Sequence, residues 1–218
     1  MEETIRQIAV WAVPVLVAVV FHEVAHGWVA YRLGDPTAAR MGRLTLNPLA
    51  HIDIFGTILI PLLLIVANSP FLFGYAKPVP VNFYNLRNPK RDMIWVALAG
   101  PGMNILIAVA SVYLLRLLAF TGGSLPMWYS EPLILMAEKS VLINVVLVAF
   151  NLLPLPPLDG GRVLVGLLPQ PYSSMVARIE PFGFLIIFAL LMTRTLDLFL
   201  APVFRFLIRL LMILGGQL

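Results

Sequence analysis

Long runs of apolar residues are the feature of this sequence that most limits what it can fold into. The first run extends from about Ile8 to Leu33, and about 20 apolar residues suffice for a helix to cross a bilayer. Hydrophobic residues make up 60% of the 218 residues and charged residues only 12%, whereas soluble domains carry about 25% charged residues. The sequence therefore predicts a protein whose solvent is lipid.

We expect an all-α polytopic membrane protein, a bundle of about five to six transmembrane or re-entrant segments. The later apolar runs are 94–120, 140–155, 182–200 and 202–214. The run 54–73 contains Pro61 and lies between two basic loops, which predicts a re-entrant or broken segment. Short β segments are expected near residues 40–50 and 74–82.

Basic residues are concentrated in two of the loops. Loops 32–53 and 77–91 hold seven of the 15 Lys and Arg residues, whereas loop 121–131 has none. Because Lys and Arg accumulate on the cytoplasmic side of short loops, the first two loops are expected inside and the third outside. The formal charge of +4 then indicates contact with anionic lipid headgroups rather than with nucleic acid. The first apolar run has no small-residue cleavage site, so we expect it to be retained.

Three ionisable residues, His22, Glu23 and His26, lie within five positions of the first apolar run. Residues four apart share a helix face, so both imidazoles can reach one metal ion, while Glu23 lies where it can activate a water at that metal. Zinc hydrolysis needs such nitrogen ligands and such a carboxylate. Placing one ionisable side chain at the bilayer centre costs about 2.5–3.5 kcal/mol. We therefore interpret the cluster as functional rather than as hydrogen-bonded core histidines.

A catalytic zinc ion usually takes three protein ligands, and cysteine is absent. The candidates for the third ligand are His51 and Asp159. Asp159 follows a proline-rich break after the run 140–155, and irregular backbone at membrane depth is tolerated only when it is buried or lines a cavity. The first run and the run 140–155 both lead from outside to inside, so Asp159 can meet the histidines in the cytoplasmic half. We prefer Asp159, with His51 as the alternative.

Two motifs together resemble the site-2 protease family of intramembrane zinc metalloproteases. They are His-Glu-Val-Ala-His at 22–26 and Asn-Leu-Leu-Pro-Leu-Pro-Pro-Leu-Asp-Gly-Gly at 151–161. Residues 42–48, 74–82 and 100–104 also resemble compact bacterial and archaeal members, a form without a PDZ or CBS domain. The resemblance implies that His22, His26 and Asp159 bind one Zn²⁺ and that Glu23 is the general base of peptide hydrolysis.

The resemblance also suggests two substrate contacts. Asn104 matches a family asparagine, which we expect to donate a hydrogen bond to the substrate backbone or to the oxyanion. The alternative for Asn104 is an interhelical hydrogen bond. The stretch 74–82 could present an extended edge to which an unwound substrate adds as a strand, or it could be a loop at the membrane surface.

We therefore expect a single membrane domain, 1–218, with a catalytic core over about 8–161 and C-terminal helices over about 162–218. It would cut peptide bonds in or near transmembrane segments of membrane proteins, as in regulated intramembrane proteolysis. The expected setting is a bacterial or archaeal plasma membrane, with the active site toward the cytoplasmic half. A metal-ion transporter is the competing class, and it leaves Glu23 without a role. A purely structural bundle is the second alternative, and the proline-flanked Asp159 argues against it.

Overall fold

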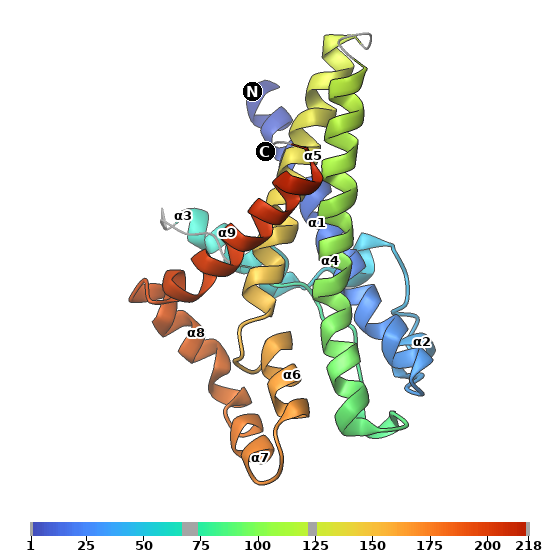
Figure 1. Ribbon diagram of the computed structural model, residues 1–218, viewed down its shortest axis with the longest axis vertical. Coiled ribbons are helices and arrows are strands. Elements are labelled where there is room, and N and C mark those ends of the chain that lie inside the picture. Colours follow the sequence, from blue (N-terminus) through green and yellow to red (C-terminus); the bar gives the residue numbers. More distant parts are fainter. Residues whose placement is uncertain (1, 67–73, 122–125, 217–218) are drawn as a thin grey trace.

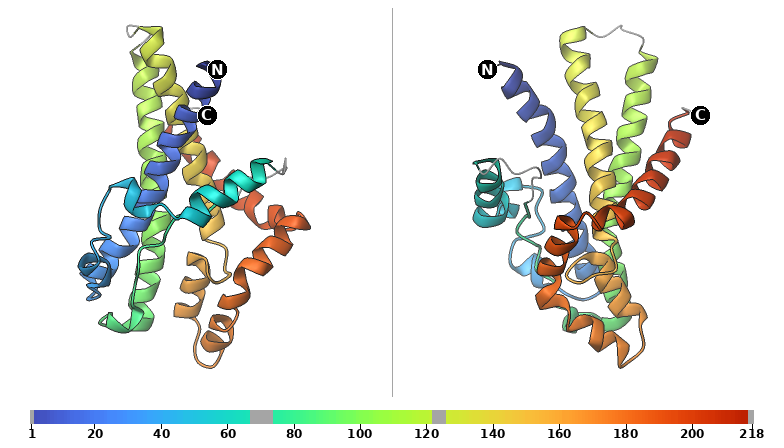
Figure 2. Two further views of the ribbon diagram at one scale, coloured as in Figure 1. Left: turned by 180° about the vertical axis from the view of Figure 1, so that it is seen from behind. Right: turned by 90° about the vertical axis from the view of Figure 1, so that its left-hand side faces the viewer.

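The computed structural model describes residues 2–66, 74–121 and 126–216, and helices make up most of these ranges. Three long helices form its axis: α1 (Glu2–Arg32), α4 (Pro89–Phe120) and α5 (Met127–Asn151). They lie side by side, and α4 runs antiparallel to α1 and α5 (Figures 1 and 2). The other helices are α2 (Thr37–Arg40), η1 (Pro48–His51), η2 (Ile54–Leu59), α3 (Ile60–Val66), η3 (Phe83–Asn85), α6 (Asp159–Leu167), α7 (Tyr172–Ala177), η4 (Glu180–Phe182), α8 (Gly183–Met192) and α9 (Leu196–Leu214).

The helical membrane bundle that the sequence predicts is confirmed. Four helical stretches in the described residues are long and apolar enough to cross a membrane: Arg6–Arg32, Pro89–Phe120, Met127–Asn151 and Tyr172–Met192. A shorter apolar segment covers Ile54–Leu64, and α9 is not one of the four candidate spans. The count of five to six segments therefore stays a prediction. The direction of α1 and α5 relative to α4 also agrees with the order of the loops inferred from their charge.

Small residues line the contacts among the three long helices. Ala18, Ala30, Ala97, Ala108 and Ala149 are each at most 3% exposed. Lipid is as apolar as leucine, so helices in a bilayer associate through close packing rather than through the hydrophobic effect. The large apolar side chains lie outward instead, which is the distribution that a lipid solvent favours.

The expected β segments are wrong. Within the described residues no strand is formed, and the stretch near 40–50 is a turn followed by the 3-10 helix η1. Residues 74–82 are extended but pair with no strand, because Pro78 and Pro80 have no N–H group. The N–H groups of Val79 and Asn82 in this stretch are bound by carboxylates instead.

The two ends of the segment that follows Asp53 lie next to each other. The N–H of Tyr75 donates to Gly56 O at 3.0 Å, and the Thr57 hydroxyl donates to Tyr75 O at 2.9 Å. Between them the helix changes from π to α type at Ile60, next to Pro61. This agrees with the re-entrant path predicted for 54–73, of which residues 67–73 lie outside the described residues.

The predicted helix boundary between residues 200 and 202 is also wrong. The chain breaks earlier, between α8 and α9, where Arg194 adopts a φ of 55° in the left-handed region. Pro202 lies inside α9. Proline is tolerated within membrane helices because neighbouring groups satisfy the freed carbonyl, so this proline did not mark an end.

Candidate metal centre

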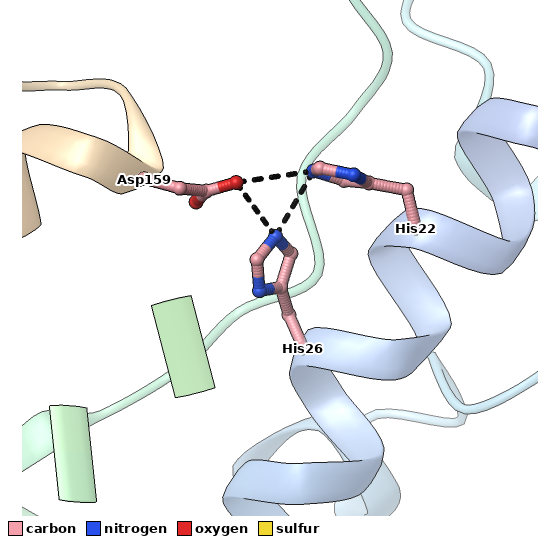
Figure 3. A group of neighbouring side chains, drawn as sticks. All are labelled: His22, His26 and Asp159. Carbon is pink, nitrogen blue, oxygen red and sulfur yellow. Dashed lines mark hydrogen bonds and ion pairs between the residues drawn. The ribbon is translucent and has the colours of Figure 1, made fainter. Parts of the chain in front are cut away.

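Two elements far apart in the sequence bring three candidate ligands together. His22 and His26 point from α1 toward Asp159, the first residue of α6 (Figure 3). Their Nε2 atoms lie 3.0 Å apart, and each lies 3.3 Å from Asp159 Oδ2. The three side chains are buried, with 6–9% exposure. This group could hold a metal ion.

Two glycines allow the start of α6 to carry Asp159 to this point. A Cβ at Gly160 would collide with the backbone of Leu152 and Leu153, and one at Gly161 would collide with the backbone of Leu155 and Pro156. The first turn of α6 is therefore pressed against the turn that ends α5. Only residues without a side chain permit this approach, which gives the Gly-Gly pair after Asp159 its structural role.

A third glycine sets the distance between α4 and the histidines. A Cβ at Gly100 would collide with Nε2 of both His22 and His26. At Gly102, two positions along the same helix, an added Cβ meets no described atom within 4 Å. The α4 backbone therefore forms one wall of the candidate metal centre at Gly100.

Hydrogen bonds on the far side of each imidazole fix which nitrogen faces the centre. His22 Nδ1 lies 2.6 Å from Asn104 Oδ1, and His26 Nδ1 lies 2.6 Å from Val96 O. These oxygens only accept, so each Nδ1 carries a proton, and in the neutral imidazole that binds a metal each Nε2 then presents a lone pair.

The lone pairs meet a carboxylate oxygen that has no donor of its own. No N–H or O–H group of the described residues hydrogen-bonds to the buried Asp159 Oδ2. With neutral imidazoles, two nitrogen lone pairs and a carboxylate oxygen face one another, an arrangement that a bound cation would stabilise. This donor set is one that catalytic zinc uses, and the outward Nδ1 partners are those that metal-binding histidines usually have.

Glu23 lies on the neighbouring face of α1, outside the group of three. Its Oε2 accepts a hydrogen bond from the N–H of Val79 at 2.7 Å. Arg43 holds the same stretch from the other side, because its Nη2 donates to Lys77 O at 2.9 Å and to Pro78 O at 3.3 Å. The extended stretch therefore sets the orientation of the Glu23 carboxylate.

The alternative third ligand, His51, does not join the group of three among the described residues. Its Nε2 donates to Thr45 O at 2.8 Å, and its carbonyl accepts from the Lys77 N–H at 2.9 Å. His51 is 2% exposed, so it acts as a buried support beneath the extended stretch.

Asn104 makes interhelical hydrogen bonds, which was the alternative to a substrate contact. It is 0% exposed, and its Nδ2 donates to Ala18 O at 3.1 Å and to Asn144 Oδ1 at 2.8 Å. Both N–H groups are used between helices, so this arrangement gives no support to contact with an oxyanion. The sequence did not indicate Asn144 or Arg43 as part of the site, although an asparagine within the apolar run 140–155 was a signal that could have identified the first.

Comparisons with known proteins find zinc metalloproteases similar to this chain. The model of peptidase family M50 matches residues 10–139 and 127–193. "Putative zinc metalloprotease YwhC" of Bacillus subtilis is 39% identical over 83% of this chain and 79% of its own length. "Putative zinc metalloprotease Rip2" of Mycolicibacterium smegmatis is 30% identical over 84% of this chain and 66% of its own length. "Zinc metalloprotease MJ0392" of Methanocaldococcus jannaschii is 23% identical over 77% of this chain and 37% of its own length. No solved structure matches.

Proposed function

This chain belongs to peptidase family M50, and from that premise we propose that it cuts peptide bonds in or near transmembrane segments of other membrane proteins. The ligands of its zinc ion would be His22, His26 and Asp159, and Glu23 would be the general base. The observation that carries the proposal is the meeting of two imidazole Nε2 atoms and one carboxylate oxygen within 4.8 Å, between a membrane-spanning helix and the turn that follows another.

The residues around the centre have separate tasks in this reaction. Zinc, when bound, polarises the scissile carbonyl and makes water a stronger acid. Glu23 takes a proton from the attacking water and passes it to the leaving amine nitrogen. Its Oε2 is engaged by the Val79 N–H, so Oε1 is the oxygen that remains for the proton. Asn104 and Val96 O keep the histidine lone pairs directed inward.

The extended stretch 74–82 is where an unwound substrate would meet the chain. A transmembrane helix satisfies its own amides, so the bond to be cut becomes accessible only after local unwinding. The N–H groups of Lys77 and Val79 are engaged inside the protein, and Pro78 and Pro80 have none. Arg43 also engages the carbonyls of Lys77 and Pro78, so a substrate strand could pair with this part of the stretch only to a limited extent. Val81→Pro tests such pairing more cleanly than Val79→Pro, because the latter also removes the Glu23 partner.

We place the protein in the plasma membrane of a bacterium or archaeon, with the site toward the cytoplasmic half. The basic loops follow the end of α1 and precede the start of α4, and these two ends lie at the same end of the bundle (Figure 1). Because Lys and Arg favour the cytoplasmic side, that end is the inner one. The partners we propose are a transmembrane protein substrate and membrane lipids.

Purified Glu23→Gln protein, compared with wild type and Glu138→Gln, tests the proposal. Glu138 is exposed on α5 and serves as the matched control. We expect Glu23→Gln to retain zinc and to lose cleavage of a transmembrane reporter by at least about 100-fold, while Glu138→Gln cleaves normally. Cleavage by Glu23→Gln at the wild-type rate would remove Glu23 from the mechanism. If wild-type protein carries zinc into vesicles but does not cleave the reporter, the result favours the transporter instead.

A further inference from the structure

We propose that Asn144 of α5 is a positioning residue for the zinc site, which acts through Asn104 to hold His22 in its metal-binding tautomer. This inference rests on the zinc site proposed above. It concerns a residue that touches neither the metal centre nor a substrate. The argument follows the direction of each hydrogen bond from α5 through α4 to α1.

The direction is set first at Asn144. This side chain is 0% exposed, and its Nδ2 donates to the backbone carbonyl of Ser140 at 2.8 Å. A backbone carbonyl can only accept, so the amide nitrogen of Asn144 must lie on that side. Its Oδ1 is therefore turned toward α4.

The orientation of the Asn144 amide fixes the orientation of the Asn104 amide. Its Nδ2 donates to Asn144 Oδ1 at 2.8 Å and to the Ala18 carbonyl at 3.1 Å. If the Asn104 amide were reversed, its oxygen would face two acceptor oxygens in a site closed to water. Such an unpaired contact is costly where no solvent can compensate. The two acceptors therefore keep Asn104 Oδ1 directed at His22.

The orientation of the Asn104 amide in turn fixes the tautomer of His22. Its Nδ1 lies 2.6 Å from Asn104 Oδ1 and must carry the proton, which leaves Nε2 as a lone pair toward His26 and Asp159. The partner of a metal-binding histidine fixes its tautomer and ring orientation. His26 needs no such series, because its Nδ1 meets the backbone carbonyl of Val96 directly.

The serine hydroxyls at the other end of this network provide a control. Ser111 Oγ lies 2.8 Å from Ser140 Oγ and 2.8 Å from Ile107 O. A hydroxyl can donate and accept, so it imposes no direction on Asn144. Ser111→Ala therefore removes a buried hydrogen bond from the same helix interface without altering the direction of the amides.

The test measures zinc affinity by competition with a chelator, and the His22 tautomer by nitrogen-15 NMR, in full-length purified protein. Asn144→Leu removes the acceptor that faces Asn104. We expect its zinc Kd to rise about tenfold, the lower end of the range for outer partners of metal ligands. We also expect the Nδ1-protonated form of His22 to lose its dominance. Ser111→Ala should match wild type in both readouts.

Asn144→Asp supplies a second variant that keeps the direction. A carboxyl buried at this depth is neutral, so its hydroxyl can donate to Ser140 O while its carbonyl accepts from Asn104. We expect Asn144→Asp to bind zinc with wild-type affinity. If Asn144 acted only through its size and shape, Asn144→Asp and Asn144→Leu would have the same zinc affinity. Wild-type zinc affinity and tautomer in Asn144→Leu would overturn the inference, as would a tenfold loss in Asn144→Asp. If wild type binds zinc but does not cleave the reporter, the proposed function fails and this inference does not.

Discussion

His22 and Glu23 are neighbours on α1, yet the structure supports them in different ways. The far nitrogen of His22 contacts Asn104 of α4, and behind it lies Asn144 of α5; both asparagines are fully buried between long helices. Glu23 instead contacts the backbone of an extended stretch outside any helix. That stretch is secured at a few points, among them Arg43 and Asp35.

The difference suggests how the two tasks of the site are separated. Metal ligands must keep a fixed geometry, and interlocked helices with small residues between them provide it. Glu23, as the proposed general base, would work next to a substrate that enters and leaves, and its support comes from a segment outside the helices. Three changes, ordered from the largest expected effect to the smallest, test whether this separation holds.

Gly100→Ala attacks the helical side. The added methyl group would collide with Nε2 of His22 and His26, so we expect zinc affinity to fall by more than about 100-fold and cleavage to be lost with it. Gly102→Ala is the matched control, since it makes the same change on the same helix into open space. Chelator competition measures both variants. Equal zinc affinity in the two would show that the α4 wall is not rigid.

Arg43→Gln attacks the extended side. The shorter amide cannot span the carbonyls of Lys77 and Pro78, so the Val79 N–H should hold Glu23 less well. We expect kcat to fall about tenfold while zinc content stays at the wild-type level, measured by reporter kinetics and metal analysis. The exposed Arg40 provides the control variant Arg40→Gln. If instead KM rises at unchanged kcat, the stretch serves substrate binding rather than the base.

Asp35 tests the same stretch through pH. Burial raises the pKa of its carboxyl, but hydrogen bonds from Thr37, Asn85 and Asn82 outweigh this and hold the pKa below its ordinary value. A folded-state pKa below the unfolded value of about 3.9 stabilises the fold at higher pH, and this contribution is lost as the pH falls through the folded pKa.

We expect Asp35→Asn to lower Tm by a few degrees at pH 7 and by less near pH 3, as measured by thermal unfolding in detergent. Its catalytic effect should be the smallest of the three, because Asn82 is the far end of the stretch. A Tm difference that stays constant between the two pH values would mean that the charge on Asp35 does not secure the stretch.

The length of the apolar runs and the spacing of residues within them predicted the features that depend on local sequence. The first run and the run 94–120 became α1 and α4, and the four-residue spacing placed His22 and His26 on one face. Asp159 was expected beside them because the proline-rich break and the Gly-Gly pair indicated a turn at membrane depth. The structure brings it there.

The start of α5 could not be predicted because it depends on partners from another helix. Glu131 and Lys139 interrupt the apolar pattern, so the run appeared to begin at residue 140 and residues 121–131 appeared to be a loop. In the structure Glu131 pairs with Arg6 at 2.5 Å, and the Lys139 ammonium lies 5.0 Å from the centre of the Trp11 ring. Helix α5 therefore starts at Met127.

The choice between two roles for Asn104, and the part played by Asn144, could not be predicted for a related reason. A sequence shows that an amide lies in an apolar run, but not which of its two ends meets a donor. The substrate contact proposed for Asn104 presumed a free N–H, whereas both are engaged by Ala18 and Asn144. Only the spatial arrangement of three helices decides that question.

The length of α4 links the chemistry to the lipid around it. Its 32 residues extend about 48 Å at about 1.5 Å per residue, and a typical hydrocarbon layer is about 30 Å thick. The excess must be taken up by tilting or by protrusion, and Gly100 and Asn104 lie near the helix midpoint. We therefore expect the depth of the proposed zinc site to depend on acyl-chain length, so that thicker bilayers move the cleavage position along a bound substrate.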